Sequence, residues 1–104
     1  MLFRSDLSHN KISNYGANLL SKYLLNNELL TSLNLADNKI GTEGGCYFAE
    51  GLREKNSLLH LNVKLNCLSD DGCHMLLKGL LQNDTLIELD IGSNMAGTKV
   101  CLTV

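Results

Sequence analysis

The pattern of hydrophobic and polar positions repeats along the chain every 28 residues. Leucine, or a residue of similar shape, recurs at this interval in several columns: Leu2, Leu30, Leu58 and Leu86; Leu7, Leu35, Val63 and Ile91; Leu24, Leu52 and Leu80. An asparagine column (Asn10, Asn38, Asn66 and Asn94) and a glycine column (Gly16, Gly44 and Gly72) keep the same interval. Independent columns that share one period without an insertion indicate a chain built from repeated structural units.

Within each unit the hydrophobic period changes from that of a strand to that of a helix. Short segments alternate apolar and polar residues as in a strand with one buried face: Leu33-Asn34-Leu35, Leu61-Asn62-Val63 and Leu89-Asp90-Ile91. Residues 14–26, 42–54 and 69–82 carry apolar residues at helical spacing, and Ser13, Thr42 and Ser69 are predicted N-caps. A strand and a helix in every 28 residues predict a parallel sheet with helices on its outer side.

The motif L-x-x-L-x-L-x-x-N-x-I, followed by a helix that opens with G-x-x-x-L, fits residues 30–48 and 58–76. These residues resemble the leucine-rich repeat family, in its ribonuclease-inhibitor-like class of 28-residue repeats. The resemblance implies an α/β solenoid, a right-handed leucine-rich-repeat arc of about 3.5 repeats with short parallel strands inside and helices outside. It divides a single domain, residues 1–104, into repeats at about 2–29, 30–57 and 58–85, a partial repeat at 86–97 and a non-repeat tail at 98–104.

The asparagine and glycine columns are predicted to be structural. After each strand the backbone turns inward, and its amide and carbonyl groups have no strand partner. A buried carboxamide both donates and accepts hydrogen bonds, so asparagines stacked at 28-residue intervals can satisfy each turn. The glycines are expected to lie where the helix backbone comes closest to the sheet.

The two ends of the chain depart from the repeat. Ser5 stands where Leu33, Leu61 and Leu89 stand in later units, and Val100 replaces the glycine of the column. Neither end resembles the polar cap that shields the terminal units of repeat proteins. We therefore expect a fragment or short isoform of a longer solenoid, with self-association through its uncapped apolar ends.

The composition of the chain argues against some classes of partner and favours one cellular compartment. Nine Lys and Arg residues against eleven Asp and Glu residues give a formal net charge of −2, so no basic surface for nucleic acid is expected. No apolar run is long enough to cross a membrane, and the first ten residues lack the apolar core of a signal peptide. The sequence predicts a cytoplasmic protein whose four cysteines are reduced.

Candidate binding residues lie at the outward positions of the predicted strands. One column holds Arg4, Ser32, His60 and Glu88. The next column begins with Asp6 and continues with Asn34, Asn62 and Asp90. Because neighbouring strands lie about 4.8 Å apart, His60 and Glu88 are expected to pair. Lys64 and Leu65 follow the third strand, and two positions are open for Leu65: facing a partner, or tucked into the turn.

The sequence does not predict catalysis, a cofactor or a metal site. Its three histidines fall in different columns, and the cysteines lack metal-ligand spacing. Cys73 and His74 are adjacent on a predicted helix, so their side chains point apart, and the column of Cys73 suggests a small buried residue. Asp70 and Asp71 are explained by the positive end of a helix.

Three functions remain. The first is a non-catalytic scaffold that binds a polypeptide partner through its concave sheet and adjoining loops. The second is a structural subunit of the axonemal nexin–dynein regulatory complex in cilia and flagella. Residues 61–66 and 89–94 resemble stretches in the leucine-rich-repeat subunits of that complex, the T-complex-associated testis-expressed proteins. The third is a regulator of an enzyme, such as a small-GTPase activator, because the same repeat class includes such proteins.

Overall fold

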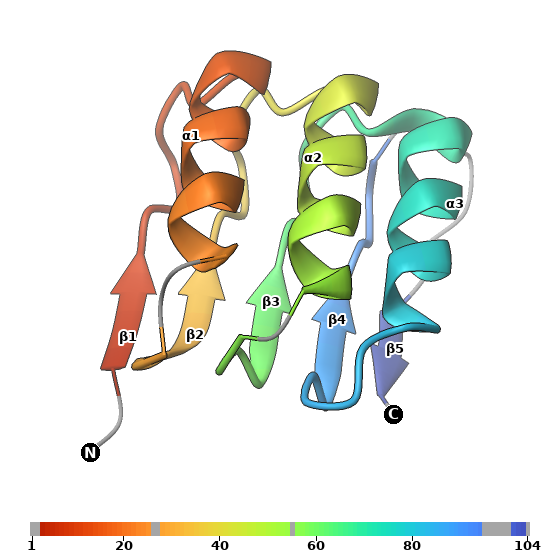
Figure 1. Cartoon of the computed structure of the whole chain (residues 1–104). Helices are drawn as coiled ribbons and strands as arrows, with labels where there is room; N and C mark the ends of the chain where they lie inside the picture. The colour runs from red at the N-terminus through yellow and green to blue at the C-terminus, as the bar shows by residue number, and fades with distance from the viewer. Residues whose placement is uncertain (1–2, 26–27, 55, 95–100, 104) are drawn as a thin grey trace.

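The computed structural model describes residues 3–25, 28–54, 56–94 and 101–103. Strands and helices alternate along the chain: β1 (Phe3–Asp6), α1 (Asn14–Leu25), β2 (Leu30–Asn34), α2 (Thr42–Arg53), β3 (His60–Asn62), α3 (Ser69–Leu80), β4 (Glu88–Asp90) and β5 (Cys101–Thr103). The strands form one layer and the three helices a second layer on one face of the sheet (Figure 1). Leu2 and Val100 of the predicted columns, and the end of the partial repeat, lie outside the described residues.

The strand order in the sheet is β1-β2-β3-β4-β5, the order of the chain, and β1 to β4 are parallel. Neighbouring strands pair with the 28-residue offset read from the sequence, as in Leu33, Leu61 and Leu89. Each helix connects two adjacent parallel strands, so the predicted sheet with helices on one side is confirmed. The three helices begin within one residue of their expected starts.

The core lies between the sheet and the helices. Alternate strand residues point into it, and so do Leu35, Val63 and Ile91 directly after β2, β3 and β4, each no more than 2% exposed. Phe48 and Leu76 meet them from α2 and α3 and are fully buried. This inward set leaves the polar alternate residues on the other face of the sheet, which we call the strand-side face.

The asparagine column forms a continuous hydrogen-bonded ladder. Asn66 donates to the carbonyl oxygens of Val63 and Lys64 in its own turn at 3.0 and 3.1 Å, and to Leu35 in the preceding turn at 2.9 Å. Its Oδ1 accepts the amide of Ile40 at 3.0 Å. Asn38 and Asn94 repeat this set of bonds, one unit to each side. The ladder therefore ties each strand-to-helix turn to the one before it.

The column glycines lie where a side chain would not fit, but the nearest atoms belong to the turns and the neighbouring helices rather than to the sheet. A Cβ on Gly44 would meet Ile40 of its own turn at 2.3 Å and Ala17 of α1 at 3.1 Å. A Cβ on Gly72 would meet Leu68 at 3.1 Å and the Thr42 backbone of α2 at 3.3 Å. The glycines thus allow the helices to pack against their own preceding turns and against each other.

The capping of the helices also differs from the expectation. The N-caps of α2 and α3 are Gly41 and Leu68, and neither makes a side-chain capping bond. The hydroxyls of Thr42 and Ser69, predicted to cap, bond each other at 2.8 Å across the two turns. Asn14 at the start of α1 caps the next helix instead, because its Oδ1 accepts the amides of Gly41 and Gly44 at 2.7 and 2.9 Å.

The C-terminal side of the sheet has a strand that the repeat did not predict. β5, which lies in the predicted non-repeat tail, pairs antiparallel with β4, with Leu102 opposite Leu89. β4 therefore has a strand partner on both sides, and its backbone is not an open edge.

Candidate functional site

The strand-side face carries the outward columns side by side. Arg4 pairs with Ser32, Ser32 with His60, and His60 with Glu88 in the strand register, so the predicted column is one row across the sheet. The row of Asp6, Asn34, Asn62 and Asp90 runs parallel to it, one alternate residue further along the strands. The helices lie on the opposite face and leave both rows uncovered (Figure 1).

His60 and Glu88 are close enough to pair, with Nδ1 of His60 3.6 Å from Oε1 of Glu88. Both side chains are about half exposed, at 45% and 54%. A solvated pair of this kind contributes about 0–1 kcal/mol, so it is available to a partner rather than committed to the fold.

The side chains of Asn34, Asn62 and Asp90 also stabilise the turns that follow the strands, a role that the sequence did not suggest. In each unit the side-chain Oδ1 accepts the backbone amide two residues later at 3.0 Å, closing the start of the turn. At Asp6 the hydroxyl and the backbone amide of Ser8 both bond the carboxylate and lower its pKa. These side chains are thereby held in fixed orientations on the face.

A second ion pair lies in the turns and was missed by sequence reasoning. His9 Nδ1 lies 2.7 Å from Asp37 Oδ2, and both side chains are exposed. The two residues are 28 positions apart, which is the signal that could have revealed the pair. Together with His60 and Glu88, they show that histidine and carboxylate meet across neighbouring units.

Leu65 lies on the surface and not in the core, since 48% of it is exposed. Its φ is 56°, in the left-handed region, and so are those of His9, Asp37 and Ser93 at the same place in the other turns. Lys64 beside it is exposed as well. The structure therefore places Leu65 on the surface and not tucked into the turn, and its contact with a partner stays a prediction.

Two apolar residues on the strand side were not singled out from the sequence. Ile87 is 46% exposed, and Leu59 beside it is partly exposed. The amide of Ile87 bonds the carbonyl of Leu59 at 2.8 Å, so the two are neighbours in adjacent units. Their signal in the sequence is that both are apolar where the preceding unit has Thr31.

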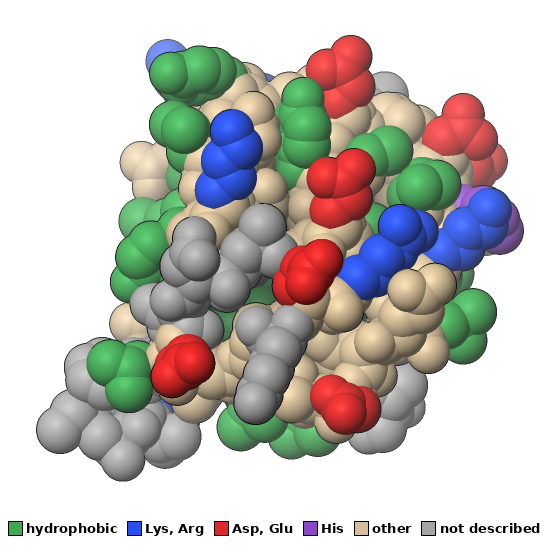
Figure 2. All heavy atoms as spheres, viewed as in Figure 1, with side chains coloured by type: hydrophobic (Ala, Val, Ile, Leu, Met, Phe, Trp, Pro, Cys, Tyr) green, Lys and Arg blue, Asp and Glu red, His purple; other side chains and the backbone are tan. Residues whose placement is uncertain are grey.

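The helix side has a different character. Lys, Arg, Asp and Glu side chains are interspersed among apolar ones over α2 and α3 (Figure 2). On α1, Tyr15, Leu19 and Tyr23 are exposed at 74%, 51% and 56%. Self-association through the uncapped ends of the solenoid, expected from the sequence, stays a prediction, and α1 is the helix at the N-terminal end of the row (Figure 1).

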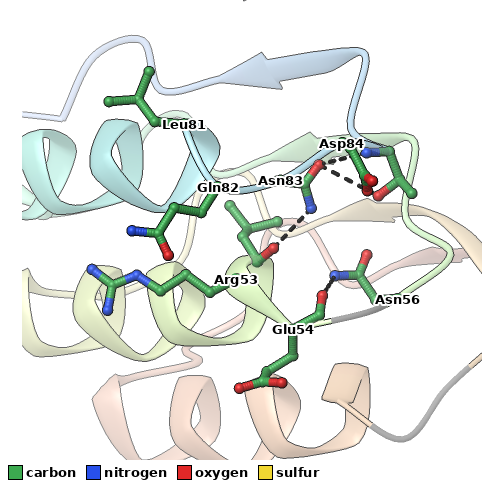
Figure 3. Close-up of a pocket in the computed structure, with 9 residues that line it drawn as sticks. Arg53, Glu54, Asn56, Leu81, Gln82, Asn83 and Asp84 are labelled. Carbon is green, nitrogen blue, oxygen red and sulfur yellow. Dashed lines mark hydrogen bonds between the residues drawn. The ribbon is translucent and has the colours of Figure 1, made fainter.

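An open pocket of about 640 Å³ lies between the C-terminal ends of α2 and α3 and the segments that follow them. Asn83 spans it, donating to the carbonyl of Leu52 at 2.8 Å and accepting the amide of Thr85 at 2.9 Å (Figure 3). Its side-chain oxygen also accepts the amide of Leu86 at 2.6 Å. Arg53 and Glu54 extend away from Asn83 rather than converging on it (Figure 3). The polar groups of this pocket thus brace the loops and do not form a reactive constellation.

Other chemistry is limited among the described residues. They include no cluster of histidine, cysteine and carboxylate suited to a metal ion. Cys73 is buried as expected, whereas His74 beside it is exposed. Two effects raise the pKa of the Cys73 thiol: burial, which is the larger, and the negative charge of nearby Asp70. Cys46, Cys67 and Cys73 are free thiols. No helix in the described part of the chain is long and apolar enough to cross a membrane.

Comparison with known families agrees with this architecture. The family model described as Leucine Rich repeat matches residues 26–49 and 54–77. Two segments of the chain thus match leucine-rich repeats, and the four parallel strands with their helices fit an α/β repeat fold. No curated protein matches the chain.

Proposed function

We propose that these leucine-rich repeats form a non-catalytic protein–protein interaction scaffold, which binds a polypeptide partner through the strand-side face and the adjoining turns. The supporting observation is the exposed row of Arg4, Ser32, His60 and Glu88, held in register on the face without helices. Leucine-rich repeats commonly mediate protein–protein interaction. In this proposal the face is the concave side of a right-handed solenoid of about 3.5 repeats.

The physical advantage of this face is its order before binding. The asparagine ladder fixes the turns, and the Oδ1 bonds of Asn34, Asn62 and Asp90 fix the side chains beside the row. A partner that docks there would freeze few side chains, so less of its binding free energy is lost to ordering.

Site-specific photo-crosslinking tests this proposal. A photoreactive amino acid replaces His60 on the strand-side face or, as the matched control, Lys78 on the exposed face of α3. Illumination of the cells that make the protein should link a discrete polypeptide to position 60 and not to position 78. Crosslinks at position 78 alone would refute binding through the strand-side face.

A second candidate is a structural subunit of the axonemal nexin–dynein regulatory complex. It is favoured by the similarity of residues 61–66 and 89–94 to subunits of that complex, and these residues lie on β3, β4 and the turns that follow. A cytoplasmic protein of this kind would concentrate in cilia, and a tagged chain should then co-extract with axonemes. Uniform cytoplasmic distribution in ciliated cells would count against it.

A third candidate is a small-GTPase activator. The strand-side face and the adjoining turns mix charges of both signs, with Arg4, Glu88 and Asp90 on the face and Lys64 in a turn, as a GTPase surface could accept. A turnover assay decides it for each GTPase tested: stimulated hydrolysis supports activation, and an unchanged rate excludes that GTPase as the target.

A further inference from the structure

We propose that Leu65, together with Lys64 and the lysines of the two preceding turns, Lys39 and Lys11, forms a docking point for an acidic polypeptide segment that carries apolar side chains. The docking point lies on the turn rim, by which we mean the strand-to-helix connections at residues 7–13, 35–41, 63–68 and 91–94. This inference rests on the proposed scaffold function and names the chemistry of the partner.

Among the described non-glycine residues with a positive φ, Leu65 is the one with a large apolar side chain. The left-handed conformation is tolerated by aspartate and histidine, which occupy the same place at Asp37 and His9, but it is unfavourable for leucine. Leu65 also exposes nearly half of an apolar side chain to water. The fold gains nothing from either cost, so the combination points to a contact made outside the chain.

The surroundings of Leu65 leave it accessible. The turn of Leu65 joins its neighbours through backbone bonds, from Asp37 to Lys64 at 3.0 Å and from Leu65 to Gly92 at 2.9 Å. The positions level with Lys64 in those neighbouring turns are Ala36 and Gly92, which are small. The positions level with Leu65 itself are Asp37 and Ser93, both polar and exposed, so Leu65 is the one apolar side chain in this row of turn residues and no large side chain lies beside Lys64.

Charge on the turn rim is opposite to that of the whole chain. The rim holds three of the nine Lys and Arg residues, Lys11, Lys39 and Lys64, all exposed, but one of the eleven Asp and Glu residues. That carboxylate, Asp37, is already paired with His9 at 2.7 Å. The rim is thus positive although the chain has a net charge of −2.

Acidic residues border this band on both sides. Glu43, Asp70 and Asp71 lie in the first turns of α2 and α3, and Glu88 and Asp90 lie on the strand-side face. A basic partner would be drawn to those borders, whereas an acidic segment fits along the lysines. Nucleic acid is a weaker fit, because three lysines in a chain of net negative charge give little phosphate attraction and Leu65 would stay unused.

The test measures binding of short fluorescent peptides by anisotropy. One peptide alternates Glu with Leu and Phe, a second has Lys in place of Glu, and a poly-dT oligonucleotide is the third probe. The acidic peptide should bind the wild-type chain, bind several-fold more weakly as salt rises, and outcompete the other two probes.

Matched variants locate the site. Leu65→Asn and, separately, Lys64→Glu should weaken acidic-peptide binding about tenfold or more, as loss of an interface anchor does. Leu81→Asn and Lys78→Glu make the same changes on exposed residues at the other end of α3 and should leave binding unchanged. Asparagine suits the left-handed conformation, so the urea midpoint of Leu65→Asn should stay near that of the wild type.

The outcomes separate this inference from the proposed function. Equal or tighter binding of the Lys peptide or of poly-dT would overturn it, and so would full binding by both Leu65→Asn and Lys64→Glu. If acidic peptides fail to bind while position 60 still crosslinks a partner, the docking point is refuted and the scaffold stands. If neither binding nor crosslinking at position 60 occurs, both are refuted.

Discussion

Replacing Asn66 with alanine removes four hydrogen bonds from the interior of the turn between β3 and α3. The carboxamide donates to the carbonyls of Leu35, Val63 and Lys64 and accepts the amide of Ile40, all between 2.9 and 3.1 Å. The side chain is 4% exposed, so water cannot take over these bonds without opening the turn.

The consequences for donor and acceptor differ. The Leu35 and Val63 carbonyls each keep a second asparagine donor, Asn38 and Asn94, at 3.0 Å. The amide of Ile40 loses the partner described above and stays buried. One orphaned buried amide and three lost bonds should lower the free energy of unfolding by roughly 2–5 kcal/mol, against a total of about 5–15 kcal/mol for a domain.

Asn10→Ala is the matched control within the same column. Asn10 is exposed, and its amide donates to the carbonyls of Leu7 and Ser8 at 2.9 and 3.1 Å, where water can replace it. This variant should lose about 1 kcal/mol or less. Urea unfolding followed by circular dichroism compares the two variants, and hydrogen exchange at the Ile40 amide should accelerate in Asn66→Ala alone. Equal losses in both variants would show that the ladder is not a buried stabilising element.

Three further predictions follow from packing, burial and backbone conformation. Gly79→Ala should lower the free energy of unfolding by about 1–3 kcal/mol, because the added Cβ would lie 2.7 Å from the Ala49 carbonyl oxygen. Gly51→Ala, whose Cβ has its nearest contact at 3.5 Å, should be neutral or stabilising. The urea midpoints of the two variants decide between these outcomes. At pH 8, iodoacetamide should label the exposed Cys67 well before Cys73, because the raised pKa of the Cys73 thiol leaves less of it as thiolate. Peptide mass spectrometry of timed samples measures the order of labelling, and the reverse order would contradict this reasoning. Leu65→Asn should change the free energy of unfolding by less than about 1 kcal/mol, because asparagine tolerates the left-handed backbone conformation better than leucine and this gain offsets the lost apolar burial. A larger loss would identify Leu65 as a core residue.

The repeated part of the fold could be predicted because the 28-residue period determines it. A 28-residue period sets the length of each unit and also the offset between paired strands, so His60 meets Glu88 in the sheet as expected. The same period places the asparagines in successive turns, and their hydrogen bonds follow from the donor and acceptor groups of the carboxamide.

Features without a repeat, or with partners in another unit, could not be predicted in this way. β5 matches no column, so nothing in the period indicates that it pairs antiparallel with β4. The capping rule assigns a cap to its own helix, but Asn14 caps the helix after it, and Thr42 bonds Ser69 instead of capping. Sequence spacing identifies neighbours in the chain, whereas these contacts depend on how closely the units stack.

The left-handed turn residues show why the type of residue there is informative about function. His9, Asp37, Leu65 and Ser93 all have φ between 54° and 58°, although their intrinsic preferences differ. The buried asparagine that follows each of the last three bonds two turns at once, and several such bonds outweigh a conformational penalty of about 1–2 kcal/mol. Since the ladder imposes the conformation on any side chain, the fold does not require leucine at position 65. Its presence there, exposed beside Lys64, is better explained by a contact with another molecule than by stability.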